Sequence, residues 1–166
     1  MPIKTCDLLF ANIRSIKEMN KGLLADIGDR IKSESTKLSD LFIEFVPILA
    51  MYNDYCQKNV GANLLLTKLL GAESKETKFK EFCNKQVSDP RSRGLALNSL
   101  LIAAVQRVPR YKLLIQELIK NTHASHPDKH DLKKALGEVA NAAKSINEAI
   151  RAEETRQELK VRHTDE

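Results

Sequence analysis

Apolar side chains recur at steps of three and four residues along most of this sequence, the spacing that places them on one face of a helix. The first such stripe falls between residues 4 and 30 and predicts one or two helices. Its members are Leu9, Ile13, Ile16, Leu23 and Ile27. A polar segment at residues 32–37 follows, and a second stripe then runs from Leu38 to Cys56. Because this stripe contains Pro47, we expect its helix to bend there.

Two shorter helices are predicted next, at residues 64–70 and 75–86, since Gly61 and Gly71 interrupt the apolar pattern. Residues 88–94 read SDPRSRG, a composition typical of a loop. The longest stripe of the chain follows and needs a partner surface along its whole length. It comprises Leu97, Leu101, Ala104, Val108, Tyr111, Ile115 and Leu118.

The last helix is predicted after THASHPDKHD at residues 122–131, which breaks the preceding helix. Its apolar face runs from Leu132 to Ile150, and residues 155–166 form its charged tail. The composition is poor in the β-branched and aromatic residues that sheets favour. We therefore expect an all-α fold, an elongated antiparallel helical bundle, with residues 1–166 as a single domain.

Charge and cysteine content narrow the possible functions. The net charge is +5, but 27 Lys and Arg are interleaved with 22 Asp and Glu and only 5% of residues are aromatic, so no nucleic-acid surface is indicated. Cys6, Cys56 and Cys83 form no C-x-x-C pair, which fits a reducing, cytoplasmic setting. No apolar run approaches the ~20 residues that span a bilayer. Any membrane contact is expected to be indirect, through recruitment by neighbouring domains.

One stretch places polar and basic residues in the middle of an aliphatic helix. Residues 100–118 read LLIAAVQRVPRYKLLIQEL. One side of this helix, distinct from the apolar stripe, carries Ile102, Gln106, Pro109 and Leu113, with Arg110 beside them. A proline inside a helix costs ~3 kcal/mol, so a bend is expected. A mixed apolar and basic surface is typical of a protein–protein contact. The alternative is a kinked core helix whose arginines extend to solvent.

Sites for metals, cofactors and covalent catalysis are not indicated. His123, His126 and His130 have spacings that a metal could use, but Pro127 interrupts them in a segment that reads as a loop. The sequence contains no G-x-x-x-x-G-K-[ST] phosphate loop and no convincing set of nucleophile, base and orienting group. We expect no metal, no cofactor and no catalytic residues.

Four segments resemble a known family. Residues 100–122, LLIAAVQRVPRYKLLIQELIKNT, and 126–148, HPDKHDLKKALGEVANAAKSINE, resemble the third signature block and last helix of the Dbl homology (DH) domain, the exchange-factor domain for Rho-family GTPases. Residues 38–59, LSDLFIEFVPILAMYNDYCQKN, are similar to the second block, and residues 8–27, LLFANIRSIKEMNKGLLADI, to the segment before it. The likeness runs from about Leu8 to Glu154.

The resemblance implies an elongated helical bundle that acts on a GTPase without making or breaking a bond. Members of the family grip both switch regions, distort the magnesium and phosphate sites so that GDP leaves, and hold the nucleotide-free form until GTP enters. Such a factor binds the empty GTPase more tightly than the loaded one, so nucleotide affinity must fall while it is bound.

The resemblance also implies roles for individual residues. Arg110 and Asn147 stand where the family contacts switch II, and Gln106 would line the same surface. Glu154 lies two helical turns after Asn147, where it would pair with a basic residue of switch II or remain a solvated acid. Ile102 matches a position that helps to choose among GTPases, and isoleucine there suggests Rac. The predicted GTPase-binding residues are Ile102, Gln106, Pro109, Arg110, Leu113, Asn147 and Glu154.

One part of the family pattern has no counterpart here. The DH domain opens with a first signature block, whose Thr-Glu pair engages switch I, and no segment of this sequence matches it. We therefore expect an N-terminally truncated DH-like domain with weak exchange activity. Without that helix, part of the stripes at residues 9–27 or 97–118 would be exposed, which predicts a homodimer or a domain-swapped oligomer.

Two other classes of function stay open. A DH-fold scaffold, or an inactive fragment, would bind partners without promoting nucleotide exchange. A helical bundle with a charge of +5 could instead bind acidic membranes, and this binding would fall steeply with salt.

Overall fold

The computed structural model describes residues 3–33 and 37–162, which form helices joined by short connections. The elements are α1 (Ile3–Phe10), α2 (Ile13–Lys32), α3 (Ser39–Phe45), η1 (Val46–Leu49), α4 (Ala50–Leu70), α5 (Thr77–Val87), η2 (Pro90–Ser92), α6 (Leu97–Val105), α7 (Arg107–Lys120) and α8 (Lys129–Arg162). No strand occurs in these two described ranges, which confirms the predicted all-α fold.

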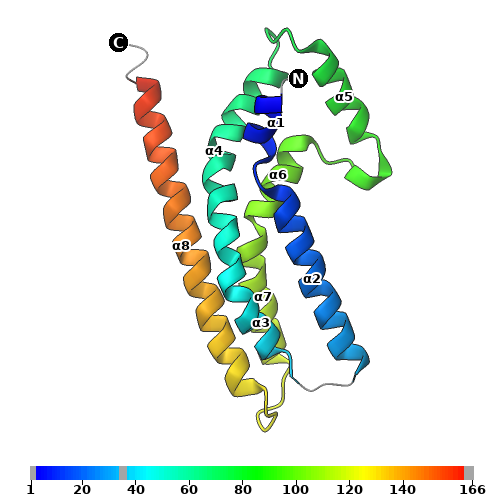
Figure 1. Ribbon diagram of the computed structural model, residues 1–166, viewed down its shortest axis with the longest axis vertical. Helices are drawn as coiled ribbons and strands as arrows, with labels where there is room; N and C mark the ends of the chain where they lie inside the picture. Colours follow the sequence, from blue (N-terminus) through cyan, green and yellow to red (C-terminus); the bar gives the residue numbers. More distant parts are fainter. Residues whose placement is uncertain (1–2, 34–36, 163–166) are drawn as a thin grey trace.

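The long helices lie along one axis of the molecule and give it an elongated shape (Figure 1). Successive long helices α2, α4, α7 and α8 run in opposite directions. Helix α8 has 34 residues, about 50 Å at 1.5 Å per residue, and packs along α7, α4 and α3. The predicted elongated antiparallel bundle is thus confirmed. No helix of the described residues is both long enough and apolar enough to cross a bilayer.

The apolar stripes meet in two buried clusters. The larger cluster joins α2, α3, α4, α7 and α8 and includes Ile16, Phe45, Tyr52, Val108, Tyr111, Ile115, Leu132 and Ile146. The smaller one joins α1, α4 and α6 through Leu9, Ala62, Leu66 and Leu101. Part of each stripe stays accessible, since Ile13, Ile27, Leu97, Ala104 and Leu118 are only partly buried. The predicted oligomer stays a prediction.

The first predicted helical region is two helices, and one later helix boundary departs from the sequence pattern. The first helical region splits at Ala11, whose φ of 42° is left-handed. The predicted helix at residues 64–70 is not separate, because α4 continues through Gly61 to Leu70. A single glycine costs only about 1 kcal/mol in a helix, and buried Ala62 and Leu66 offset that cost by packing. At Pro47, where a bend is predicted, the 3-10 helix η1 separates α3 from α4.

The kink predicted at Pro109 appears one turn earlier in the chain, at Gln106. Pro109 is the third residue of α7 and has no N–H to donate to the carbonyl of Val105, four residues before it. Helix α6 accordingly ends at Val105 and α7 begins at Arg107. The N–H of Arg110 still reaches the Gln106 carbonyl, at 3.4 Å. The proline therefore divides the stretch into two helices, with only Gln106 between them.

A buried carboxylate fixes the connection between α7 and α8. Asp128 is 1% exposed, and its Oδ2 accepts hydrogen bonds from the backbone N–H groups of Leu38 at 2.8 Å and Ser39 at 3.2 Å. Its Oδ1 accepts a further bond from the Ser39 hydroxyl. These donors stand at the N-terminus of α3, so Asp128 caps a helix that begins 89 residues earlier in the chain.

Candidate functional site

A shallow groove of about 330 Å³ lies between α7 and α8. Pro109 from α7 and Asn147 from α8 both line it, so the structure brings together two of the predicted residues that lie far apart in sequence. Asn147 is exposed. Hereafter this is the α7–α8 groove, and its other lining residues are Lys112, Ala140, Ala143, Lys144, Glu148 and Arg151.

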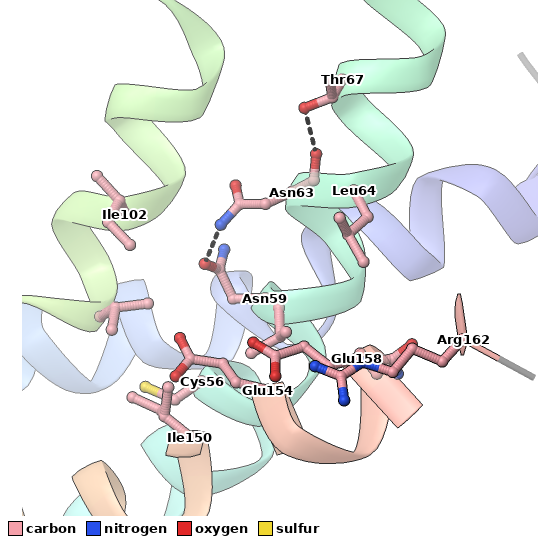
Figure 2. Close-up of a pocket in the computed structure, with 13 residues that line it drawn as sticks. Cys56, Asn59, Asn63, Leu64, Thr67, Ile102, Ile150, Glu154, Glu158 and Arg162 are labelled. Carbon is pink, nitrogen blue, oxygen red and sulfur yellow. Dashed lines mark hydrogen bonds between the residues drawn. The ribbon is translucent and has the colours of Figure 1, made fainter. Parts of the chain in front are cut away.

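A larger hollow of about 580 Å³ lies further along α8, against α4 and α6. Ile102 from α6 and Glu154 from α8 line it, which unites two more of the predicted residues (Figure 2). On the α4 side, the Asn63 Nδ2 donates to the Asn59 Oδ1 at 3.0 Å, and the Thr67 hydroxyl donates to the Asn63 carbonyl at 2.9 Å. These bonds hold the polar part of the wall of the α4–α8 hollow in place.

The three remaining predicted residues line neither cavity. Gln106 and Arg110 are exposed where α6 meets α7, and an Arg110 guanidinium N–H donates to the Gln106 Oε1 at 3.2 Å. Leu113, one turn after Pro109, is 59% exposed. None of the seven predicted residues is buried, so all of them are available at the surface.

An aromatic network sets the orientation of α7. Tyr111 is 3% exposed and meets the ring of Phe45 edge to face at 5.3 Å. Its hydroxyl donates to the Asn20 Oδ1, and the Asn20 Nδ2 donates to the Tyr52 hydroxyl at 2.8 Å. Burial raises the pKa of Tyr52 to about 12. The guanidinium of Arg107 lies 4.7 Å from the centre of the Tyr111 ring, on the solvent side of the network.

The structure offers little for redox or covalent chemistry at the hollow. Cys56 lines it but is 1% exposed, and burial raises the pKa of its thiol to about 11, so it remains protonated. His123 and His126 use their Nδ1 atoms within their own loop, with Ser125 and the Asp128 N–H. Across the described ranges, no three His, Cys, Asp or Glu side chains gather where they could hold a metal ion.

Sequence reasoning missed part of each cavity. Arg151 lies one helical turn after Asn147, so helical spacing alone would have placed it beside the α7–α8 groove. Leu64 was assigned to a separate short helix, which concealed its place on α4 facing the α4–α8 hollow. Lys112 and Lys144 gave no sequence signal, because exposed lysines are frequent throughout the chain.

Comparison with known proteins identifies the family of this chain. Residues 1–147 match the RhoGEF domain family. Intersectin-2 of Mus musculus is 33% identical over 158 residues, which cover 92% of this chain and 9% of intersectin-2. Guanine exchange factor for Rac 30 of Dictyostelium discoideum is 33% identical over 149 residues, covering 88% of this chain and 9% of that protein.

Solved structures share the fold. The DH/PH domains of PDZ-RhoGEF, in a complex with GTP-gamma-S activated RhoA, superpose with a TM-score of 0.83 at 24% identity, covering 96% of this chain and 46% of that one. The DH domain of FARP2 gives a TM-score of 0.73 at 24% identity, covering 100% of this chain and 80% of that one. The chain belongs to the RhoGEF domain family, and it spans about a tenth of the length of the curated relatives that it matches.

Proposed function

We propose that this chain is a guanine nucleotide exchange factor domain that binds Rho-family GTPases through their switch regions and promotes GDP release. The observation that carries the proposal is the α7–α8 groove, in which Pro109 and Asn147 come together beside the exposed Gln106–Arg110 pair. In a RhoGEF-family chain, this is the surface that the resemblance assigns to switch II. Ile102 and Glu154 extend it along α8 to the α4–α8 hollow.

The action of such a domain is a matter of differential binding. If the domain binds the empty GTPase more tightly than the GDP-loaded form, thermodynamic reciprocity requires that it weaken GDP binding by the same factor. No covalent step is involved, so the domain needs no nucleophile or bound metal of its own. Rigid packing of α7 on α8 would hold Arg110 and Asn147 in place while the GTPase distorts.

Substitutions at the two switch II positions test the surface. Arg110→Glu and Asn147→Ala should each abolish detectable binding of a Rho-family GTPase while leaving the melting temperature nearly unchanged. For Arg110→Glu, loss of one partner of a buried interfacial charge pair costs ~2 to 5 kcal/mol, or about 30-fold to 4,000-fold in affinity. Arg14→Glu on α2 and Asn141→Ala on α8, both exposed, are matched controls that should bind normally. A large fall in melting temperature for Arg110→Glu or Asn147→Ala would place that residue in the fold and not in the interface.

The substrate is proposed to be Rac-like, because Ile102 lines the α4–α8 hollow at the position that helps to choose the GTPase. Two relatives support a Rho-family substrate by name, one an exchange factor for Rac and one a complex with RhoA. Release of a fluorescent GDP analogue from a panel of Rac, Cdc-type and Rho GTPases tests this choice, with magnesium depletion as the positive control. Faster release from RhoA than from Rac would overturn the Rac assignment.

A scaffold of the same fold without exchange activity is the second candidate. It predicts GTPase binding through the same surface with no acceleration of GDP release. The release assay separates the two candidates directly.

A further inference from the structure

Another cavity lies beside α5, a helix that stands away from α8 (Figure 1). Its volume is about 370 Å³, and α1, α5, η2 and α6 all contribute to its wall. None of the described residues that line it belongs to the α7–α8 groove or to the α4–α8 hollow. We call it the α5 pocket, and its large apolar side chains are Phe10, Phe79, Phe82, Leu95, Leu97 and Leu100.

The apolar face of α5 is only partly covered. Phe79, Phe82 and Cys83 recur at helical spacing, and all three line the α5 pocket. Yet no residue of α5 is buried, and Phe82 is 58% exposed. Leu95 and Leu100, which line the same pocket, are 44% and 40% exposed. The fold thus leaves large apolar side chains open to solvent around one hollow, and exposed apolar surface of this kind marks a site for another molecule.

The surface around the α5 pocket is basic. Residues 75–94 contain six Lys and Arg against three Asp and Glu, a net charge of +3 on a chain whose total is +5. Lys78 lies four residues before Phe82 and Lys85 three residues after it, so both flank the exposed ring along α5. Glu81 lies between the two lysines on the helix surface and is the one acid of α5. Both lysines are exposed, and within the described part of the chain neither forms an ion pair.

The charge pair at η2 is already complete. The Arg91 guanidinium donates from Nε to the Asp89 Oδ1 at 3.0 Å and from a terminal nitrogen to the Asp89 Oδ2 at 2.8 Å. The same Oδ1 accepts the backbone N–H of Arg91 at 2.9 Å, which caps η2. These bonds hold this part of the wall in place and compensate both charges. The free positive charge beside Phe82 is therefore that of Lys78 and Lys85.

We propose that the α5 pocket is a docking site for an acidic amphipathic segment of a partner protein. A leucine or aromatic side chain of that segment enters the pocket and contacts Phe79 and Phe82. Carboxylates of the same segment lie against Lys78 and Lys85. Because the pocket shares no residue with the GTPase surface, docking here does not depend on the proposed function, and a GTPase and this partner bind at the same time.

The shape of the site favours a protein segment over a membrane surface. A helix that lies on a membrane turns its apolar face outward to the lipid. The apolar face of α5 is instead turned towards α1 and α6 and encloses a hollow. Its volume falls within the range of pockets that bind ligands, roughly 300 to 1,000 Å³. Burial of an apolar side chain supplies most of the affinity, and the acidic neighbours raise the association rate and fix the orientation.

Peptides test the site on the whole chain. The probe is a fluorescent peptide that repeats Glu-Glu-Leu-Phe, which places its apolar residues at helical spacing. One control has the same composition with acidic and apolar residues in alternation, and the other has Lys in place of Glu. In fluorescence anisotropy the probe should bind, and both controls should bind at least about tenfold more weakly. Its affinity should fall as salt is raised, and it should protect Cys83, which lines the pocket, from alkylation read by mass spectrometry.

Substitutions on α5 test the two parts of the site separately. Phe82→Ser should lower the affinity for the probe about tenfold, and Lys85→Glu about fivefold. Glu81→Lys should raise the affinity, a gain that unfolding cannot produce. Leu24→Ser and Lys17→Glu on α2, both exposed, are matched controls that should leave the affinity unchanged.

The outcomes separate this site from the alternatives. Absence of probe binding, equal binding of the alternating peptide, or binding that is indifferent to Phe82→Ser and Lys85→Glu would overturn the proposal. Binding to phosphatidylserine vesicles that is tighter than binding to the probe and is lost in the same variants would replace it with a membrane site. Arg110→Glu should bind the probe normally. Loss of probe binding in that variant would place the peptide on the GTPase surface and contradict a separate site.

Discussion

Replacing Asp128 with alanine should destabilise the fold far more than replacing the nearby Asp131. The carboxylate is 1% exposed and accepts three hydrogen bonds from residues that begin α3. Its removal leaves the N–H groups of Leu38 and Ser39 and the Ser39 hydroxyl without that acceptor. The connection between α7 and α8 also loses its attachment to α3.

The expected cost follows from those three donors. A buried polar group left without a partner costs about 1 to 3 kcal/mol, and Leu38 is partly exposed, so water can relieve part of the penalty. We therefore expect a loss of about 3 to 5 kcal/mol in the free energy of unfolding. For a domain of this size that corresponds to a fall in melting temperature of roughly 6 to 20 °C.

Urea unfolding followed by circular dichroism at 222 nm measures this loss, and two variants calibrate it. Ser39→Ala removes one of the three donors and should cost about 1 kcal/mol. Asp131→Ala, three residues after Asp128, removes only an exposed ion pair with Lys37 at 3.8 Å and should cost less than about 1 kcal/mol. If Asp128→Ala unfolds at the same urea concentration as Asp131→Ala, the buried carboxylate does not fix α8 to α3 and the reasoning is wrong.

Three further predictions test the helix packing. Tyr111→Ala should cost about 3 to 5 kcal/mol in urea unfolding, because the ring is 3% exposed and packs on Phe45; a loss below 1 kcal/mol would place Tyr111 outside the core. Pro109→Ala restores a helical N–H and should join α6 to α7. The helical circular dichroism signal at 222 nm should then rise, and GTPase binding should weaken. An unchanged spectrum with normal binding would contradict this. Hydrogen bonds from Arg30 hold the pKa of Asp40 below its usual value. The pair therefore stabilises the fold above about pH 4, and this contribution is lost as pH falls through the lowered pKa. Arg30→Gln should therefore flatten the acid limb of a stability profile, and an identical profile would refute the assignment.

The apolar pattern was sufficient to predict the helices and their shared core. The stripes that contain Ile16, Tyr52, Val108 and Leu132 were visible in sequence and meet in one cluster. Boundaries were harder to predict where packing competes with local preference. Gly61 favours a break, but the burial of its neighbours on α4 keeps the helix continuous.

The candidate site could be predicted only in part from the sequence. Helical spacing and the family resemblance indicated Arg110, Asn147 and Glu154 as surface residues, and the structure places all three at the surface. The two cavities could not be predicted, because they depend on how α8 crosses α7 and α4. Asp128 was overlooked for a related reason, since its partners lie about 90 residues earlier in the chain.

The preference for nucleotide-free over GDP-loaded GTPase tests the central claim most directly. Calorimetry with RhoA and Rac, each prepared empty and GDP-loaded, gives the ratio of the two dissociation constants for this chain. The account predicts at least tenfold tighter binding to the empty form of one of them, about 1.4 kcal/mol, and loss of that preference in Arg110→Glu. Equal affinity for the empty and GDP-loaded forms of both GTPases would contradict it and would identify the chain as a binding scaffold.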